Sequence, residues 1–217
     1  MNSHYYYMFT VINRLFILIM TSIDIQRIFE LYENYGDSEY IGEAVSQKQH
    51  MIQCAMLAEK EGYPKQIVLG ALFHDIGHLV GMAQGLEGMV TTEGVKLGIV
   101  NHETVGETFL LDLGIPQEIA AFVRGHVDAK RYLVYKDKSY YEGLSRSSKQ
   151  TLTHQGGPMI EEEAKQFEKS PYFDAILRMR RWDELAKDPN AHTEPLDKYK
   201  QLCQSYLEQR NTEISRI

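Results

Sequence analysis

Apolar residues recur at helical spacing along most of the chain. Between residues 23 and 35, Ile25, Ile28, Phe29 and Tyr32 fall on one face of a helix. The same spacing predicts helices over residues 44–61, 66–79, 103–113, 116–126, 161–169, 171–187 and 196–210, with short helices between 140 and 152. Alternating apolar and polar positions, which are typical of strands, are nearly absent. The pattern therefore predicts an all-α protein.

One long stretch interrupts the helical pattern. Residues 81–98 hold five glycines, at positions 81, 85, 88, 94 and 98. We predict an irregular segment here. A loop of this length in a compact domain is often a lid or a binding loop, and it is equally compatible with a tolerated surface insertion.

The N-terminal segment differs from the rest of the chain. Residues 5–20 are strongly apolar, but Asn13 and Arg14 interrupt them, whereas a membrane-spanning helix needs about 20 apolar residues. The segment also lacks the basic start and the small-residue cleavage site of a signal peptide. We therefore expect an apolar N-terminal extension over residues 1–22, one helical domain over residues 23–217, and no membrane association. The extension is either a variable segment or a first helix packed on the domain.

Composition narrows the class of protein. The 217 residues suit one large domain, and 43% hydrophobic with 24% charged residues is ordinary for a globular protein, which excludes wholesale disorder. A formal net charge of −7 argues against nucleic-acid binding, and the densest basic cluster (Arg178, Arg180 and Arg181) is small. Cys54 and Cys203 lie far apart and form no disulfide framework, so we expect a reducing, cytoplasmic setting.

The first candidate chemistry is the pair His74-Asp75, which follows a strongly apolar run. Neighbouring residues in a helix point about 100° apart, so both can reach one metal only where the helix ends and the backbone turns. Gly77 would permit such a turn. A buried polar pair is costly unless it is paired or ligated, and a carboxylate, unlike a neutral imidazole, can bridge two cations.

Three further histidines and one aspartate stand on other predicted helices. Taken singly, each is more often a satisfied core or surface residue, and Asp183 could pair with Arg180 or Arg181. Together the six residues are the ligands expected of a two-metal site: His50, His74, Asp75, His102, His126 and Asp183. Nitrogen and oxygen ligands without thiolate suit Fe, Mn, Ni, Co or Zn.

At these residues the sequence resembles the HD-domain superfamily, an all-helical metal-binding fold with an H…HD…D signature. It is more closely similar to the branch of HD-domain di-iron oxygenases that contains the PhnZ-type phosphonate oxygenases. The matching blocks are YIGE at 40–43, HDIGH at 74–78, HVDAKRYL at 126–133, LTHQGG at 152–157 and RWDELAK at 181–187. The resemblance implies an HD-domain helical bundle with a dinuclear metal site.

The resemblance also implies how the ligands divide between two iron ions (Fe2+/Fe3+). The first iron would be bound by His50, His74, Asp75 and Asp183. The second iron would be bound by Asp75, His102 and His126, so that Asp75 bridges the two. O₂ would be the co-substrate. The ligand types alone suit manganese as well as iron.

Further residues receive roles in catalysis and substrate binding from the same resemblance. Tyr40 would cap the second iron until substrate displaces it, and Glu43, on the same side if the segment is helical, would hold a cationic nitrogen of the substrate. With them, His78 and Lys130 complete the expected catalytic group. The substrate-binding residues would be Glu43, His78, Lys130, Ser148, Thr151, Gln155 and Arg180. Simpler alternatives are a solvated Lys130, a helix cap at Ser148 and a turn at Gln155.

Three classes of function follow. The first is a di-iron oxygenase that uses O₂ to cleave the C–P bond of (R)-1-hydroxy-2-aminoethylphosphonate, giving glycine and inorganic phosphate, or that acts on its trimethylammonio analogue. The second is a metal-dependent HD phosphohydrolase, in which metal-bound water attacks a phosphate ester. The third, a non-enzymatic helical binding module, would not need all six ligands. Tyr40 and Glu43 have no evident task in a hydrolase, which favours the oxygenase.

The expected partner is a small organophosphonate, and the sequence does not indicate an oligomeric state.

Overall fold

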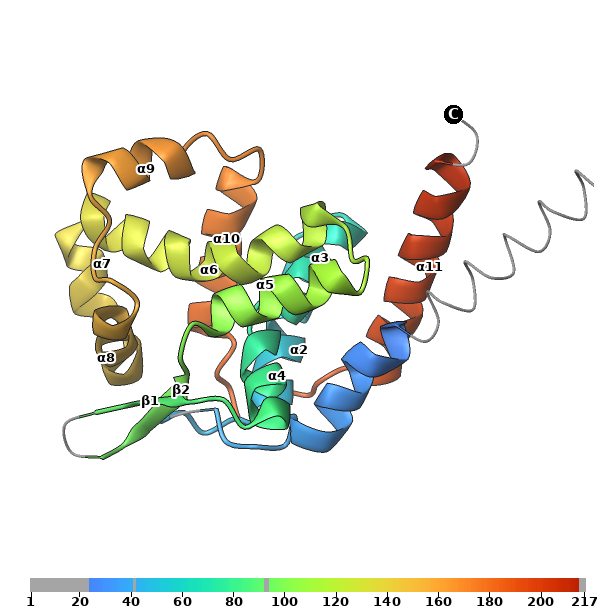
Figure 1. The fold of residues 1–217 in the computed structure, drawn as a ribbon, viewed down its shortest axis with the longest axis horizontal. Helices are drawn as coiled ribbons and strands as arrows, with labels where there is room; N and C mark the ends of the chain where they lie inside the picture. Colours follow the sequence, from blue (N-terminus) through green and yellow to red (C-terminus); the bar gives the residue numbers. More distant parts are fainter. Residues whose placement is uncertain (1–23, 41, 92–93, 215–217) are drawn as a thin grey trace, which may run out of the picture.

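The computed structural model describes residues 24–40, 42–91 and 94–214. Within these residues the protein is a bundle of helices with one short β-hairpin (Figure 1), which confirms the predicted all-α class. The predicted N-terminal extension, residues 1–22, lies outside the described residues.

The described elements follow one another in a fixed chain order. A helix over residues 24–35 comes first. It is followed by α2 (Gln47–Lys60), α3 (Lys65–Phe73), α4 (Ile76–Gln84), β1 (Gly88–Val90), β2 (Lys96–Ile99), α5 (His102–Asp112), α6 (Gln117–Lys136), α7 (Lys138–Gly143), α8 (Arg146–His154), α9 (Glu161–Phe167), α10 (Phe173–Leu185) and α11 (Leu196–Ile214). Most predicted helices agree with these bounds to within a few residues.

The predicted continuous helix over residues 66–79 is two helices. α3 ends at Phe73, and α4 starts at Ile76 with its axis bent by 42°. The break falls at His74-Asp75, where Asp75 has φ −105° and ψ 11°. The prediction that the backbone turns beside this pair is correct, but Gly77 lies inside α4 rather than at the turn.

The predicted irregular stretch over residues 81–98 is largely regular. α4 continues to Gln84 and ends at Gly85, whose positive φ of 66° suits glycine. An antiparallel hairpin follows, in which Gly88 pairs with Ile99. The strands were missed because they are only three and four residues long and rich in glycine.

The predicted helix over residues 116–126 continues as α6 to Lys136, so His126 lies in its interior rather than at its end. The helix continues because Val127, Ala129 and Val134 extend its buried face. Gly125 does not end the helix. A Cβ at this position would lie 2.6 Å from Ile176 of α10, so the glycine allows α6 and α10 to pack closely.

The core lies among the helix over residues 24–35, α2, α3, α6 and α10. Tyr32, on the predicted apolar face of the first helix, is fully buried and donates a hydrogen bond to the Leu72 carbonyl oxygen (2.7 Å). Cys54 and Cys203 are buried free thiols. Among the described helices, none is long and apolar enough by itself to cross a membrane, and only the bent pair of α3 and α4 reaches that length jointly.

Candidate metal centre

The fold brings the six predicted ligands together from five elements. His50 lies on α2, His74 and Asp75 lie at the break between α3 and α4, and the remaining three lie on α5, α6 and α10: His102, His126 and Asp183. All six are buried, and none exposes more than 4% of its surface. Six polar side chains gathered away from water require partners of their own.

Asp75 lies between two pairs of histidines. Its Oδ2 atom is 3.5 Å from His50 Nε2 and 3.3 Å from His74 Nε2. Its Oδ1 atom is 3.6 Å from His102 Nε2 and 3.2 Å from His126 Nε2. Each carboxylate oxygen therefore faces one pair, which is the arrangement that a bridging ligand needs.

Within each pair the two Nε2 atoms face each other. They are 3.1 Å apart between His50 and His74, and 3.0 Å apart between His102 and His126. Asp183 lies with the His50 and His74 pair, because its Oδ1 atom is 3.4 Å from His50 Nε2. These three residues are called the first group of ligands. For metal–ligand bonds of about 2.1 Å, neighbouring ligand atoms lie about 3.0–3.4 Å apart, so these separations fit two coordination shells.

The other ring nitrogen of each histidine decides where its proton lies. The Nδ1 atoms of His50 and His74 lie 2.9 and 2.8 Å from the carbonyl oxygens of Ala186 and Ala71. Those of His102 and His126 lie 3.3 and 2.5 Å from backbone carbonyl oxygens as well. A carbonyl oxygen only accepts hydrogen bonds, so each neutral ring carries its proton on Nδ1 and turns an Nε2 lone pair inward.

Four lone pairs that point inward and two buried carboxylates favour a positive charge at the centre of the site. Burial alone would raise the pKa of Asp75, but His74, His126 and His50 hold it well below its usual range. Burial likewise lowers the pKa of His50, but hydrogen bonds with Asp183 and Asp75 outweigh burial and raise it to about 9. The donor set therefore fits one or two metal cations, and its nitrogen and oxygen atoms suit iron or manganese.

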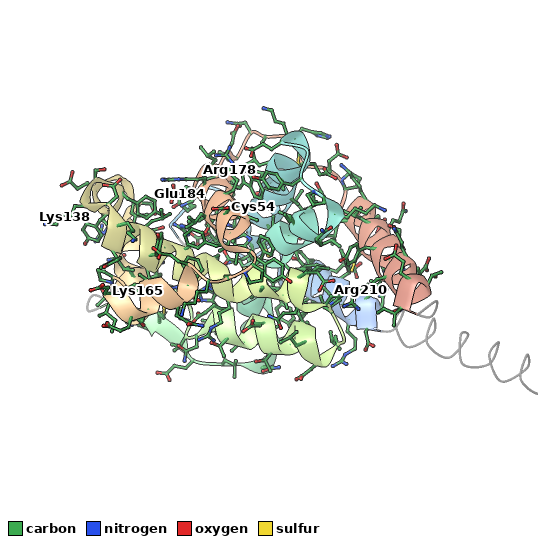
Figure 2. All side chains as sticks on the ribbon, turned by 90° about the horizontal axis from the view of Figure 1, so that it is seen from above. Cys54, Lys138, Lys165, Arg178, Glu184 and Arg210 are labelled. Atoms are coloured by element: carbon green, nitrogen blue, oxygen red, sulfur yellow. The ribbon has the colours of Figure 1, made fainter. Side chains whose placement is uncertain are left out.

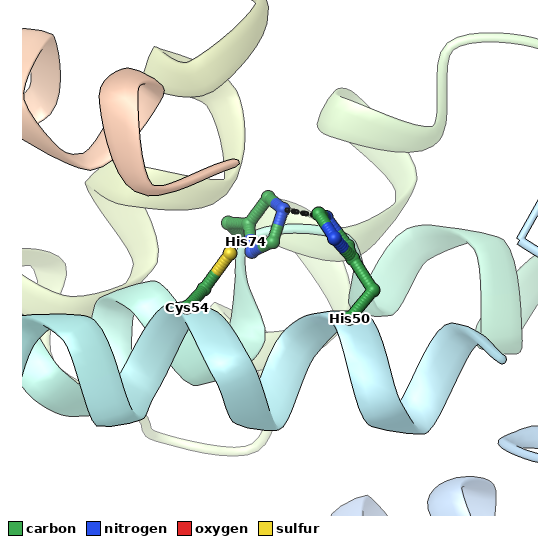
Figure 3. A group of neighbouring side chains, drawn as sticks. All are labelled: His50, Cys54 and His74. Carbon is green, nitrogen blue, oxygen red and sulfur yellow. Dashed lines mark hydrogen bonds between the residues drawn. The ribbon is translucent and has the colours of Figure 1, made fainter. Parts of the chain in front are cut away.

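Cys54 is a buried neighbour of the site. It lies one helical turn after His50 on α2, and its Sγ atom lies within 4.8 Å of ligand atoms of His50 and His74 (Figure 3). Burial, with Asp183 and Asp75, raises the pKa of its thiol well above the ordinary value, which disfavours the thiolate that binds metals. Cys54 is thus a core thiol rather than a metal ligand.

His78 differs from the four histidines of the predicted ligand set. The Ile99 backbone N–H donates to its Nδ1 atom (3.1 Å), so the neutral ring carries its proton on Nε2. Burial lowers the pKa of His78 to about 4, which keeps the ring neutral. Its ring stacks on that of His102 at 3.9 Å. His78 is therefore placed as a hydrogen-bond donor beside the metal ligands.

Tyr40 lies directly on the first group of ligands. Its ring stacks on His50 at 3.9 Å, and its hydroxyl lies 3.5 Å from Asp183 Oδ1. Tyr40 was expected at the second iron, but these two contacts are with ligands of the predicted first iron. Glu43 is joined to Tyr40 by a tight turn, in which its N–H donates to the Tyr40 carbonyl oxygen (2.9 Å), so the helix considered for this segment is not formed. Gly42, with φ 72°, permits this turn.

A cavity opens beside the metal ligands. All of the predicted catalytic and substrate-binding residues line it: Tyr40, Glu43, His78, Lys130, Ser148, Thr151, Gln155 and Arg180. Asp75, His102, His126 and Asp183 also line it. The cavity joins the predicted substrate-binding residues to the predicted metal ligands.

The cationic residues of the cavity are not equivalent. Arg180 is paired with Asp183 and donates to the Tyr140 hydroxyl (3.0 Å). Lys130 donates to the neutral Thr151 hydroxyl (2.9 Å), and its ammonium has no carboxylate within salt-bridge distance among the described residues. Burial, together with Arg180, lowers the pKa of Lys130 to about 7. Lys130 is thus buried rather than solvated, and it is the lining cation best placed to take an anion.

The polar residues of α8 complete this wall of the cavity. Ser145 caps α8 by accepting a hydrogen bond from the Ser148 N–H (3.2 Å), so the alternative of a helix cap at Ser148 is wrong. Gln155 follows the last residue of α8, and among the described residues its buried Oε1 atom has no hydrogen-bond partner. Its amide is therefore available to a ligand.

Lys187 lines the same cavity and was not predicted from the sequence. Its ammonium donates to Glu43 Oε1 (2.6 Å) and lies 5.8 Å from the centre of the Tyr40 ring. The residue stands at the end of the RWDELAK block that includes Asp183. A lysine four residues after a candidate ligand, on the same face of the helix predicted over residues 171–187, was the sequence signal, although α10 itself ends at Leu185.

Comparison with known proteins identifies the family. The HD domain family matches residues 48–204. Over 163 residues (75% of this chain and 80% of the relative), the chain is 40% identical to "[1-hydroxy-2-(trimethylamino)ethyl]phosphonate dioxygenase (glycine-betaine-forming)" of Leisingera caerulea. Over 181 residues (83% and 87%), it is 33% identical to "Hydroxymethylphosphonate dioxygenase" of Gimesia maris. A protein of Acanthamoeba polyphaga mimivirus, "Uncharacterized protein L432", is 39% identical over 191 residues (88% and 85%).

These matches cover most of the chain, and the residues 48–204 matched by the HD domain family include every predicted metal ligand. The chain belongs to the HD domain family. Within that family, its identity to two phosphonate dioxygenases places it among the PhnZ-like HD oxygenases, as its sequence motifs predicted.

Proposed function

We propose that this protein is a dinuclear iron oxygenase that cleaves the C–P bond of a 1-hydroxyalkylphosphonate. The observation that carries the proposal is the position of Asp75 between two inward-facing histidine pairs, next to a cavity that Tyr40 and Lys130 line. The names of the Leisingera and Gimesia relatives support the phosphonate class. Iron bound by the six ligands would supply the redox chemistry that activates O₂.

The residues of this chain would bind and orient the substrate. Lys130, with Thr151 and Gln155 nearby in the cavity wall, offers a cation and neutral groups to the phosphonate. His78 offers an Nε2–H donor beside the ligands, at a place where a hydroxyl or phosphonate oxygen would meet it. Burial of the site keeps water from competing for these groups.

The finer proposal is that the substrate is (R)-1-hydroxy-2-aminoethylphosphonate and that the products are glycine and inorganic phosphate. Glu43 would recognise the ammonium, since it is the lining carboxylate outside the predicted ligand set. Substrate and O₂ together contain the same atoms as glycine and phosphate, so no external reductant is consumed. Two buried free thiols agree with a reducing cytoplasm as the location.

The HD phosphohydrolase is the second candidate, because metal ions beside a cavity can also activate water. Nothing in a hydrolytic reaction uses a tyrosine that shields a metal ligand, and Tyr40 stacks on His50. The proposed oxygenase uses such a group to keep the reduced centre from reacting before substrate is bound.

Paired measurements of O₂ uptake and phosphate release test the proposal. Iron-loaded protein is mixed with (R)-1-hydroxy-2-aminoethylphosphonate in air, and with phosphate esters under anaerobic conditions. We expect one O₂ consumed per phosphate released, together with glycine, and no phosphate from the esters. Phosphate release from esters without O₂ would instead support the hydrolase.

A further inference from the structure

Lys187 forms a salt bridge with Glu43, the carboxylate that the proposed function assigns to the substrate's nitrogen. Its Nζ atom lies 2.6 Å from Glu43 Oε1, a short charge-assisted hydrogen bond. The side chains of Lys187 and Glu43 are 19% and 18% exposed, and both line the cavity beside the metal ligands. A substrate cation that reaches Glu43 therefore meets a carboxylate that is already neutralised.

We propose that Lys187 is a specificity-determining residue that makes the cavity selective for a primary ammonium over a quaternary one. The proposal rests on the proposed function, in which Glu43 receives the nitrogen of a phosphonate substrate. It names the substrate class as primary 2-ammonio-1-hydroxyphosphonates, and it assigns to Lys187 the rejection of the trimethylammonio analogue.

The selectivity follows from what each cation offers to a paired carboxylate. A primary ammonium has N–H donors, so it can share the carboxylate through Oε2 while Lys187 stays on Oε1, and a charged hydrogen bond is gained. A trimethylammonium has no N–H and gains only Coulomb attraction. That attraction is largely cancelled when the Lys187 charge stands 2.6 Å from the same carboxylate.

The surroundings favour this role for Lys187 over a role in phosphonate binding. Lys187 is paired with Glu43 and also faces the Tyr40 ring, 5.8 Å from its centre. Lys130 lines the cavity with a neutral hydrogen-bond partner. An incoming phosphonate gains more from Lys130, because binding Lys187 would first break an ion pair.

Binding measurements with three non-hydroxylated ligands test the proposal apart from turnover. The dissociation constants of 2-aminoethylphosphonate, 2-(trimethylammonio)ethylphosphonate and ethylphosphonate are measured calorimetrically on anaerobic, iron-loaded protein. The variants are Lys187→Met, Lys187→Gln and Lys187→Arg. Lys165→Met is the control, since Lys165 (labelled in Figure 2) is exposed and, among the described residues, forms its salt bridge with Glu161.

In the parent protein we expect 2-aminoethylphosphonate to bind about tenfold or more tightly than the trimethylammonio ligand, as one charged hydrogen bond requires. Lys187→Met and Lys187→Gln should strengthen trimethylammonio binding by about tenfold and leave ethylphosphonate unchanged, because they free the Glu43 carboxylate. Lys187→Arg keeps an ion pair with Glu43 and should retain the parent preference.

Two results would overturn the proposal. One is an unchanged preference between the two cationic ligands in both Lys187→Met and Lys187→Gln. The other is an equal loss of affinity for all three ligands, which would assign Lys187 to the phosphonate. Failure of the proposed oxygenase reaction would be seen separately, as a lack of O₂ uptake by the parent protein with the hydroxylated substrate.

Discussion

At the scale of single residues, Asp75 is the predicted ligand that faces both histidine pairs. Each of its oxygens faces one histidine pair, at 3.3–3.5 Å on one side and 3.2–3.6 Å on the other. Two cations held close together repel each other strongly unless an anion lies between them. The stability of a dinuclear centre should therefore depend on this carboxylate more than on any one histidine.

We expect Asp75→Ala to lose both metals, because the substitution removes a ligand from each ion and the anion that screens their repulsion. Metal analysis of the purified variant measures this directly. Asp128→Ala is the matched control, since Asp128 lies on α6 outside the ligand cluster and should keep the parent metal content. Two metals per chain in Asp75→Ala would rule out the bridging role.

Lys130 should serve the substrate's anion and not the metals. Lys130→Gln is expected to weaken phosphonate binding by about 1.5–3 kcal/mol, the worth of a charged hydrogen bond, which is about one to two decades in affinity. Both metals should remain bound. Calorimetric titration with ethylphosphonate checks the affinity, and an unchanged dissociation constant would show that Lys130 does not meet the ligand.

The same lysine predicts a pH dependence. Burial and Arg180 lower the pKa of Lys130 to about 7, so its charge is present below that pH and is lost as the pH rises through it. Ethylphosphonate affinity should therefore fall above about pH 7 in the parent more steeply than in Lys130→Gln. The comparison with the variant removes the titration of the ligand itself. Parallel pH profiles would contradict the assignment.

Tyr40 shields the first group of ligands through its contacts with His50 and Asp183. Tyr40→Phe keeps the ring and removes the hydroxyl. We expect the variant to bind both irons and to be oxidised by O₂ faster than the parent when no substrate is present. Stopped-flow absorbance of the reduced protein measures the rate, and equal rates in the two proteins would argue against the gating role.

At the scale of elements, the break between α3 and α4 lets two adjacent residues face one centre. The apolar run before His74 and the need to satisfy a buried polar pair were enough to predict a turn beside it. The place of Gly77 could not be predicted, because it depends on a contact with α5. A Cβ on Gly77 would lie 1.8 Å from the His102 carbonyl oxygen.

Gly77→Ala should therefore push α5, and His102 with it, away from α4. Overpacking a core usually costs about 1–3 kcal/mol. We expect the free energy of unfolding to fall by at least this amount, because backbone atoms cannot move aside as side chains do. Metal content should fall as well. Gly143→Ala is the control for thermal unfolding, since a Cβ there has nothing within 4 Å. Equal melting temperatures of Gly77→Ala and the parent would contradict this packing.

The hairpin shows why other elements were not predicted. Leu97 and Ile99 are buried and Lys96 is exposed, but an alternation over so few residues is too short to recognise in a sequence. Its contribution to the site is the Ile99 N–H, a backbone group, which fixes the tautomer of His78. Hydrogen bonds from backbone groups do not depend on residue type, so they cannot be predicted from the sequence.

At the scale of the whole molecule, helical periodicity was enough to predict the all-α class. The resemblance to the HD-domain family was enough to predict that six ligands come together. The ion pairs of the cavity did not, because Glu43 and Lys187 stand 144 positions apart and meet only in the folded chain. Other charged side chains do not line this cavity, such as Lys138 at one edge of Figure 2 and Arg210 toward the other.

The central claim is that a dinuclear centre uses O₂ to cleave a C–P bond, and isotope labelling tests it most directly. In the proposed reaction the C1 carbon keeps its hydroxyl oxygen and needs one more, and phosphorus keeps three oxygens and needs one more. Mass spectrometry of products formed under ¹⁸O₂ should therefore find label from O₂ in the glycine and phosphate. Products that carry label only from ¹⁸O-water, and none from O₂, would contradict the account.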